Sequence, residues 1–241
     1  MERGDFIGQG DGTGIDVVDW HERMGTPQAT WSGRARAGGD DALARAVALL
    51  DAGRVVAHPT STVYGLGGRP RPDVDARIAA IKRRQPGPLI RLAASREALV
   101  EALPAARWTE AARRLADAFW PGPLTLVVED GSDTGVAVRV DPHPVVRRLL
   151  ELAGGMMTST SLNLTGRPPA RTSAEARAAL SAIGSDGGTM GWLDAGDLAG
   201  SVPSTLVRMA GGAADVLREG ALPATEIVRV LSSRTSGRSS R

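Results

Sequence analysis

The feature that most constrains the fold is an alternation of strand-like and helix-like segments between residues 40 and 231. Short runs of β-branched and aliphatic residues, such as 124–128 and 136–140, alternate with stretches whose apolar residues recur every three or four positions. Such a chain buries both kinds of element most readily as a sheet flanked by helices. We therefore predict an α/β fold with a twisted mixed sheet. The sequence has no repeat at a fixed period, so a solenoid is not predicted.

Cap and turn residues predict the element boundaries. A helix is predicted to begin at Asp40 or Asp41 and to end at Gly53, and a capping box of Thr172 with Glu175 opens another. The remaining helices are predicted to begin at Asp73, Ser95, Thr109 and Pro144 and near Glu226, and the strands to occupy 54–58, 89–94, 124–128, 136–140, 156–159, 205–209 and 216–218.

The two ends of the chain lack this alternation. Residues 1–39 are polar and rich in glycine, and residues 232–241 are rich in serine and arginine. We expect a partly ordered N-terminal extension at 1–39, one folded domain at 40–231 and a disordered basic tail at 232–241. No apolar run approaches the length of a membrane span, and the first residues lack a signal-peptide core, so a cytoplasmic protein is predicted.

Composition limits the kinds of site the chain can carry. It has no cysteine and three histidines, which excludes disulfides and does not favour a metal held by side chains. The pI is about 9.8, yet the formal net charge is only +2. With one lysine, one tyrosine and no cysteine, few groups titrate above neutrality, so a small arginine excess sets this pI. Acidic residues interleave with the arginines, which does not favour a nucleic-acid-binding face.

The single lysine points to a binding site. Of the 29 Lys and Arg residues, only Lys82 is a lysine. An exposed lysine is free to become arginine in such a chain, whereas a compact ammonium donor is not. Lys82 also follows Ile78 and Ile81 at a predicted helix end, where any cation interacts favourably with the helix dipole. Together with Arg84, it predicts a clamp for phosphate or carboxylate groups.

Two further segments place short polar side chains after predicted strands. Residues 58–67 combine hydroxyls with glycines, and residues 159–169 combine hydroxyls with an asparagine amide. Ligands of α/β proteins bind where such loops leave the sheet. Ordinary polar turns have the same composition, so each segment alone leaves both interpretations open. There is no Gly-x-x-x-x-Gly-Lys-Ser/Thr loop, so a nucleotide must bind without one.

Seven segments, spread over residues 41–222, carry a family resemblance. They are His58-Pro-Thr-Ser-Thr-Val-Tyr-Gly-Leu-Gly67, Ile81-Lys-Arg-Arg84, Phe119-Trp-Pro-Gly-Pro-Leu-Thr-Leu126, Val138-Arg-Val-Asp-Pro-His-Pro144, Ser159-Thr-Ser-Leu-Asn-Leu-Thr-Gly166, Pro203-Ser-Thr-Leu-Val207 and Val216-Leu-Arg-Glu-Gly220. In order and spacing they resemble the motifs of the YrdC-like family, in the short form without an extra C-terminal domain.

The resemblance implies a twisted α/β fold with a large concave cleft and an L-threonylcarbamoyladenylate synthase activity. ATP, L-threonine and bicarbonate give threonylcarbamoyl-AMP and pyrophosphate, with Mg²⁺ expected beside ATP. The product feeds formation of threonylcarbamoyladenosine in tRNA, so tRNA or a tRNA-modifying transferase complex is a possible partner. The resemblance implies four catalytic residues, Lys82, Arg84, Ser161 and Asn163. It implies that the ATP phosphates bind to these four and to Ser159, Ser204 and Arg218. For threonine it implies Thr60, Thr62, Tyr64 and Arg139.

Four departures from the family pattern keep other functions open. Ser61 stands where the motif usually has Glu, Gln85 replaces a common Pro, and Leu162 replaces a small Ala. The stretch 82–89 is also one residue short of the usual length. One alternative is a paralogous carbamoyl or acyl-adenylate transferase with a different acceptor. The other is a non-catalytic RNA-binding module that uses the same concave surface.

Overall fold

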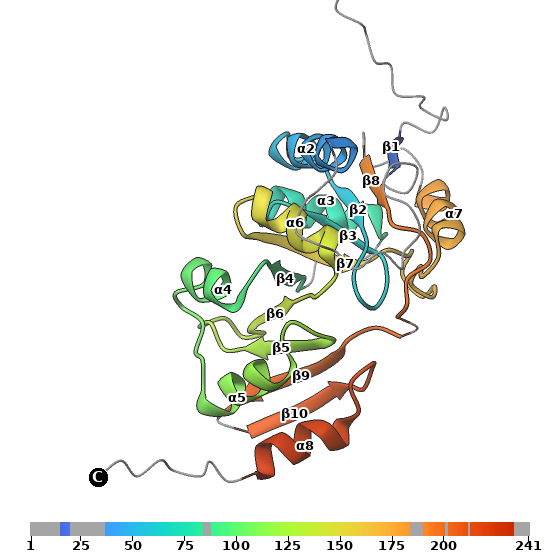
Figure 1. The fold of residues 1–241 in the computed structure, drawn as a ribbon. Coiled ribbons are helices and arrows are strands. Elements are labelled where there is room, and N and C mark those ends of the chain that lie inside the picture. Colours follow the sequence, from blue (N-terminus) through green and yellow to red (C-terminus); the bar gives the residue numbers. More distant parts are fainter. Residues whose placement is uncertain are drawn as a thin grey trace, which may run out of the picture.

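The computed structural model contains one ten-stranded sheet with helices packed against it (Figure 1). The residues it describes are 15–19, 37–83, 88–183, 190–200, 202–211 and 213–233. The strand order is β1-β8-β2-β3-β7-β4-β6-β5-β9-β10. Parallel pairs such as β4 with β6 adjoin antiparallel pairs such as β5 with β6, which confirms the predicted mixed α/β fold.

The elements alternate along the chain as the sequence predicts. The strands are β1 (Ile15–Asp19), β2 (Val56–His58), β3 (Gly65–Gly68), β4 (Ile90–Ala93), β5 (Leu124–Val128), β6 (Val136–Val140), β7 (Met156–Ser161), β8 (Met190–Asp194), β9 (Thr205–Ala210) and β10 (Ala213–Arg218). The helices are α2 (Ala37–Asp51), α3 (Pro72–Ile81), α4 (Arg96–Ala102), α5 (Glu110–Phe119), α6 (Pro144–Leu152), α7 (Ser173–Ile183) and α8 (Ala224–Ser232).

Helices cover both faces of the sheet around β8 and β2. Val55 and Ala57 pack with residues of α3 and α7, whereas Val56 packs with residues of α2 and α6. Successive residues of a strand point to opposite faces. The uninterrupted apolar run at 55–57 is therefore what a strand buried on both faces requires.

Around β5, β6 and β9, a third apolar cluster covers one face of the sheet. Leu126, Val138 and Val207 pack there with residues of α4, α5 and α8. Their strand neighbours Val127 and Arg139 line a cavity instead. Because strand residues alternate between faces, the opposite face of these strands forms a wall of that cavity.

Several of the predicted boundaries are confirmed, and others differ by one to three residues. β5, β6 and α6 have the predicted limits. The hydroxyls of Ser95 and Thr109 accept backbone N–H bonds from the first turns of α4 and α5. Thr172 and Glu175 each accept the other's backbone N–H, which is the predicted capping box.

The predicted cap of α3 is wrong. Arg71, not Asp73, is the N-cap residue, and its side chain makes no capping bond. Pro72 occupies the first turn, where its fixed φ is already helical and its missing N–H costs nothing. Asp73 lies within that turn, where a negative charge interacts favourably with the helix dipole.

Three strands, β1, β3 and β8, were not predicted, and α2 begins at Ala37, before the predicted start. The four residues of β3 are Gly65-Leu-Gly-Gly68, and glycine has low strand propensity. Here the lack of a side chain is a packing requirement: a Cβ on Gly67 would lie 2.2 Å from Cε of Met157. Contacts with β7, distant in sequence, therefore override local propensity.

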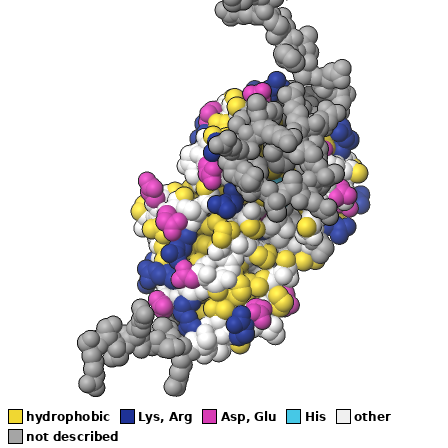
Figure 2. Space-filling view, viewed as in Figure 1, with side chains coloured by type: hydrophobic (Ala, Val, Ile, Leu, Met, Phe, Trp, Pro, Cys, Tyr) yellow, Lys and Arg dark blue, Asp and Glu magenta, His cyan; other side chains and the backbone are white. Residues whose placement is uncertain are grey.

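Charges are mixed on the face shown in Figure 2, where Lys and Arg side chains are interspersed with Asp and Glu. Among the helices in the described part of the chain, none has the length and apolarity needed to cross a membrane.

Candidate active site

A cavity of about 710 Å³ lies against the face of β5, β6 and β9 described above and extends to β3 and β7. This volume is within the range of small-molecule sites. Eight of the eleven predicted site residues line it: Thr60, Thr62, Tyr64, Arg139, Ser159, Ser161, Ser204 and Arg218. Arg84 lies outside the described residues. Lys82 and Asn163 do not line the cavity, but both contact Ser161, which does.

Lys82 contacts the 161–163 loop directly. The residue follows α3, its side chain is almost fully buried, and Nζ donates to Ser161 O at 2.6 Å and to Asn163 Oδ1 at 2.8 Å. Lys82 and the 161–163 loop therefore form one hydrogen-bonded cluster beside the cavity, which Ser161 lines. These acceptors are uncharged oxygens, and the two bonds orient the ammonium.

The same cluster fixes the asparagine amide. Ser161 Oγ donates to Asn163 Oδ1 at 2.6 Å, and Asn163 Nδ2 donates to Leu164 O and Arg167 O. Asn163 Oδ1 thus has two donors, Ser161 and Lys82. The Ser161 hydroxyl can turn toward a ligand while Lys82 still satisfies that oxygen.

Arg139 is held from several sides. Its guanidinium donates to Gly122 O, to Thr62 Oγ1 and to Ser61 Oγ, and it pairs with Asp141 at 2.5 Å. Burial lowers the pKa of Arg139, and the charge of Asp141 opposes that shift. Of the five guanidinium N–H groups, these bonds use four, which leaves one Nη1 hydrogen for a ligand in the cavity.

Asp141 is a buried carboxylate that the sequence did not single out. Oδ1 accepts from the backbone N of Ser61 and of His143, both at 2.9 Å, and Oδ2 accepts from Ser61 Oγ and pairs with Arg139. Both oxygens are therefore saturated. The sequence signal is its place two residues after Arg139, at the end of β6, where both side chains leave the strand on one side.

Thr60 shapes the turn between β2 and β3. Its hydroxyl donates to Val63 O at 2.6 Å and accepts from the backbone N of Thr62 and of Val63. These bonds use the hydroxyl within its own loop and aim the Thr62 hydroxyl at Arg139, which donates to it at 3.0 Å. The turn itself is thus part of the site's support.

Arg218 and Ser204 form another part of the cavity wall. Arg218 Nη2 donates to Ser204 O at 2.9 Å, and the hydroxyl of Ser204 bonds that of Thr125 at 2.8 Å. Burial lowers the pKa of Arg218, and no carboxylate within the described ranges pairs with it. Its charge therefore remains available to an anion, unlike that of Arg139.

The hydroxyl of Tyr64 is occupied by protein partners. It donates to Gly196 O at 2.7 Å, lies 3.2 Å from Asp194 Oδ1 and accepts from Ala195 N. Burial raises the pKa of Tyr64. Tyr64 is one of the lining residues of the cavity, and its hydroxyl fixes the segment after β8.

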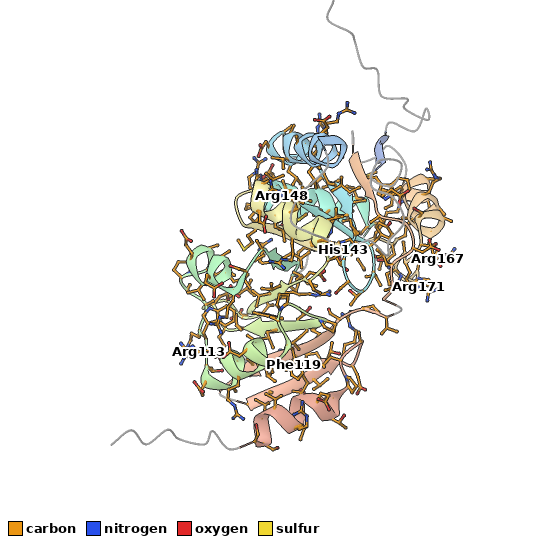
Figure 3. All side chains as sticks on the ribbon, in the orientation of Figure 1. Arg113, Phe119, His143, Arg148, Arg167 and Arg171 are labelled. Carbon is orange, nitrogen blue, oxygen red and sulfur yellow. The ribbon has the colours of Figure 1, made fainter. Side chains whose placement is uncertain are left out.

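Two histidines flank this network. His143 is the N-cap residue of α6, and its buried Nδ1 has no hydrogen-bond partner among the described groups. It lies toward the middle of the molecule in Figure 3, whereas Arg167 and Arg171 lie on the outer side near α7. His58, at the end of β2, is fully buried and bonds Ser159 Oγ at 3.1 Å. His58 was not predicted as a site residue.

Comparison with known proteins places this arrangement in a family. A family model for Sua5, YciO and YrdC, described as telomere recombination, matches residues 48–220. The chain belongs to the Sua5/YciO/YrdC family. The predicted membership is confirmed, and the position of the cavity within residues 60–218 places it inside the matched region.

Relatives of the family are similar over most of their own length. A threonylcarbamoyl-AMP synthase of Chromohalobacter salexigens is 40% identical over 58% of this chain and 80% of the relative. One of Klebsiella pneumoniae is 39% identical over 57% of this chain and 78% of the relative.

Solved structures of the family share the fold. P. abyssi Sua5, crystallised in complex with L-threonine, is 30% identical, with a TM-score of 0.72 over 90% of this chain and 61% of that chain. The present chain thus spans less than two thirds of that Sua5. E. coli YciO, with 24% identity and a TM-score of 0.63, supports the fold alone.

Proposed function

We propose that this chain is an L-threonylcarbamoyladenylate synthase, which converts ATP, L-threonine and bicarbonate to threonylcarbamoyl-AMP and pyrophosphate. The names of its relatives support a nucleotidyltransferase of this kind. The observation that carries the proposal is the cavity of about 710 Å³, whose wall joins the Lys82 cluster to the Arg139 network. A nucleotide and an amino acid fit together in a space of that size.

The phosphates of ATP are proposed to bind at the cationic side of the wall. Lys82 offers an oriented ammonium, and Arg218 offers a guanidinium that pairs with no carboxylate in the described ranges. Ser161 and Ser204, which carry hydroxyls, line the cavity together with Arg218. We assign Asn163 to holding Lys82 and Ser161 in place. Arg84 belongs to this set by its position in the motif.

Threonine is proposed to bind beside the 60–64 turn. Arg139 has one N–H left for a carboxylate oxygen, and the Thr60 and Thr62 side chains line the same region. Tyr64 contributes its ring and keeps its hydroxyl on the segment after β8. The Arg139–Asp141 pair is neutral as a whole, so this subsite recognises a carboxylate by hydrogen bonding more than by net charge.

The reaction asks the protein for positioning and charge neutralisation. The amine of threonine forms a C–N bond with bicarbonate, which loses water, or with carbon dioxide, in which case the amine releases a proton. An oxygen of the resulting carbamate attacks the α-phosphate, and the bond from that phosphorus to pyrophosphate breaks. Phosphoryl and nucleotidyl transfers of this kind depend mainly on alignment and on cations at the departing oxygens. We assign the latter task to Lys82 and Arg218.

Mg²⁺ is proposed to enter with ATP. Among the described residues, no group of three His, Asp or Glu side chains is placed to hold a metal ion. The oxygen ligands that Mg²⁺ requires would then come from the phosphates and water.

Two departures from the family pattern have structural explanations that fit this function. Leu162 is fully buried in the cluster with α3 and α7 and does not line the cavity, so its bulk does not reach the substrates. Ser61 donates to Asp141 and accepts from Arg139. A carboxylate is thus present beside this position although the motif's glutamate is not.

The wider context follows from the proposed reaction. We propose that the product supplies a transferase complex for threonylcarbamoyladenosine formation in tRNA, that the chain works in the cytoplasm, and that residues 40–231 form the catalytic domain.

The N-terminal extension, 1–39, contributes β1, which pairs with β8. The predicted tail at 232–241 lies mainly outside the described residues.

The test is pyrophosphate release by the purified protein. With ATP, threonine and bicarbonate we expect pyrophosphate and threonylcarbamoyl-AMP, identified by mass, and we expect neither when threonine is omitted. Serine and carbamoyl phosphate, each with ATP, test the paralogue with another acceptor. Pyrophosphate release with carbamoyl phosphate but none with threonine would reject the proposed function.

A further inference from the structure

His58 and Ser159 form a buried pair at the cavity wall. His58 is fully buried, while Ser159 is 4% exposed and lines the cavity. The ring nitrogen Nε2 lies 3.1 Å from Ser159 Oγ, and the other nitrogen, Nδ1, lies 3.3 Å from Pro59 O. The pair joins the end of β2 to β7, two strands that β3 separates.

The direction of the hydrogen bond follows from its second partner. A carbonyl oxygen can only accept, so the ring hydrogen of His58 lies on Nδ1 and points to Pro59 O. Burial lowers the pKa of His58 to about 4, so the ring is neutral near pH 7 and Nε2 carries a lone pair. The hydroxyl hydrogen of Ser159 must then point to Nε2.

Glycines of β3 hold the ring in this position. A Cβ at Gly65 would lie 2.5 Å from Cε1 of His58, and one at Gly67 would lie 3.2 Å from Nε2. Any larger residue at 65 would push the ring away from Ser159. The glycines at 65 and 67 therefore make room for the imidazole, and this packing explains why glycines occur at both positions.

The hydroxyls of Ser159 and Ser161 differ in whether they can turn toward a ligand. If the Ser161 hydroxyl turns to a ligand, Asn163 Oδ1 keeps Lys82 as a donor. If the Ser159 hydroxyl turned away, Nε2 would be left buried with no donor among the described residues, which is costly. Ser159 is thus fixed as a hydrogen-bond acceptor toward the cavity.

We propose that His58 is a positioning residue that fixes Ser159 as an acceptor for an N–H of the amino-acid substrate's amine. This inference rests on the proposed function and reassigns Ser159, for which the family resemblance implies ATP phosphates. Phosphate oxygens only accept hydrogen bonds, so a Ser159 fixed as an acceptor does not bind them. An amine held through its N–H keeps the nitrogen lone pair free to attack carbon dioxide or bicarbonate. Ser159 lies on the same side of β7 as Ser161, one strand step of about 7 Å away.

The test is threonine binding by calorimetry with four proteins. Ser159→Ala removes the acceptor, and we expect the threonine Kd to rise about 3- to 10-fold, the effect of one hydrogen bond. His58→Phe keeps a ring but removes Nε2, and a similar rise is expected. In His58→Gln the amide oxygen can take the place of Nε2, and we expect threonine affinity to recover toward the wild-type value.

Two controls separate this role from a structural one. Thr158→Val removes the buried hydroxyl of the preceding residue, which has no hydrogen-bond partner in the described part of the chain. Thr158 does not line the cavity, so the threonine Kd should stay within twofold. The ATP Kd should likewise be unchanged in Ser159→Ala. 3-Hydroxybutyrate lacks the amine, so Ser159→Ala should not alter its binding.

The outcomes are separable. If the wild type releases pyrophosphate with threonine but Ser159→Ala binds threonine as tightly, the inference fails and the proposed function stands. A Kd for ATP that rises as much as that for threonine would place a nucleotide donor at Ser159 and also overturn the inference. A wild type that does not bind threonine would overturn both. If His58→Phe fails to fold, the comparison of threonine with 3-hydroxybutyrate in Ser159→Ala still decides.

Discussion

Arg139 and Asp141, two residues apart at the end of β6, form an ion pair whose side chains are 5% and 0% exposed. The pair ties the 60–64 turn to β6, because both side chains also bond Ser61. A pair so deeply buried is retained only when further hydrogen bonds satisfy each member, and here they do.

Asp141→Asn should therefore destabilise the protein. Loss of the charge leaves Arg139 buried without a counter-charge, and we expect the free energy of unfolding to fall by about 3–5 kcal/mol. Denaturant unfolding measures it. Glu151→Gln, which breaks the exposed Arg148–Glu151 pair, is the matched control and should change stability by less than about 1 kcal/mol. Equal losses in both variants would contradict the role given to Asp141.

Gly65→Ala should disturb His58. The new Cβ would lie 2.5 Å from Cε1 of the ring, so the ring must move, and we expect a loss of about 1–3 kcal/mol in unfolding free energy. The double variant Gly65→Ala with His58→Ala removes the ring that the new Cβ would meet, so its total loss should be smaller than the sum of the single losses. Additive losses in thermal or denaturant unfolding would mean that the two residues do not interact.

His58 should make stability depend on pH. Its pKa is about 4 in the folded protein and near 6.5 when unfolded, so between these values only the unfolded chain binds the proton. The free energy of unfolding therefore falls as the pH is lowered from 6.5 toward 4, by about 3 kcal/mol in total. Among its charged and titratable neighbours, Asp141 raises the pKa of His58, whereas His143 and Arg139 lower it.

His58→Gln lacks this proton site and serves as the comparison. Unfolding free energies at pH 7 and pH 4.5 should show the wild type losing about 2 kcal/mol more than the variant. His143, whose pKa burial also lowers, remains in both proteins and cancels in the difference. Identical losses would show that His58 is not held neutral by burial.

Leu162→Ala should affect stability and not substrate choice. The side chain is fully buried among residues of α3 and α7, so truncation leaves a cavity and costs about 2–5 kcal/mol. Since Leu162 does not line the substrate cavity, the ratio of kcat/KM for threonine over serine should stay within about twofold. A change in that ratio without loss of stability would place Leu162 in the substrate pocket.

Much of the fold could be predicted because its signals are local. The caps at Ser95 and Thr109 and the alternation along β5 and β6 depend on a few neighbouring residues. β3 was missed because its glycines are selected by the packing of His58 and Met157, which belong to other strands.

The site residues, too, could be predicted where their sequence signal is local and not where it depends on distant partners. Lys82 stood out as the only lysine, and Ser161 with Asn163 followed from the loop motif. Asp141 has a local signal in its place two residues after Arg139, but its contact with Ser61, 80 positions away, could not be predicted. His58 was missed because its partner Ser159 is 101 positions away. Contacts of that separation leave no periodic pattern in a single sequence.

The central claim is that the oriented ammonium of Lys82 serves the reaction in this cavity. The decisive measurement is threonine-dependent pyrophosphate release by Lys82→Met, compared with wild type at equal folded fraction judged by melting temperature. We predict a fall of at least about 100-fold, as for other preorganised groups that stabilise developing charge. Lys82→Met that folds and retains activity within a few-fold of wild type would contradict the account.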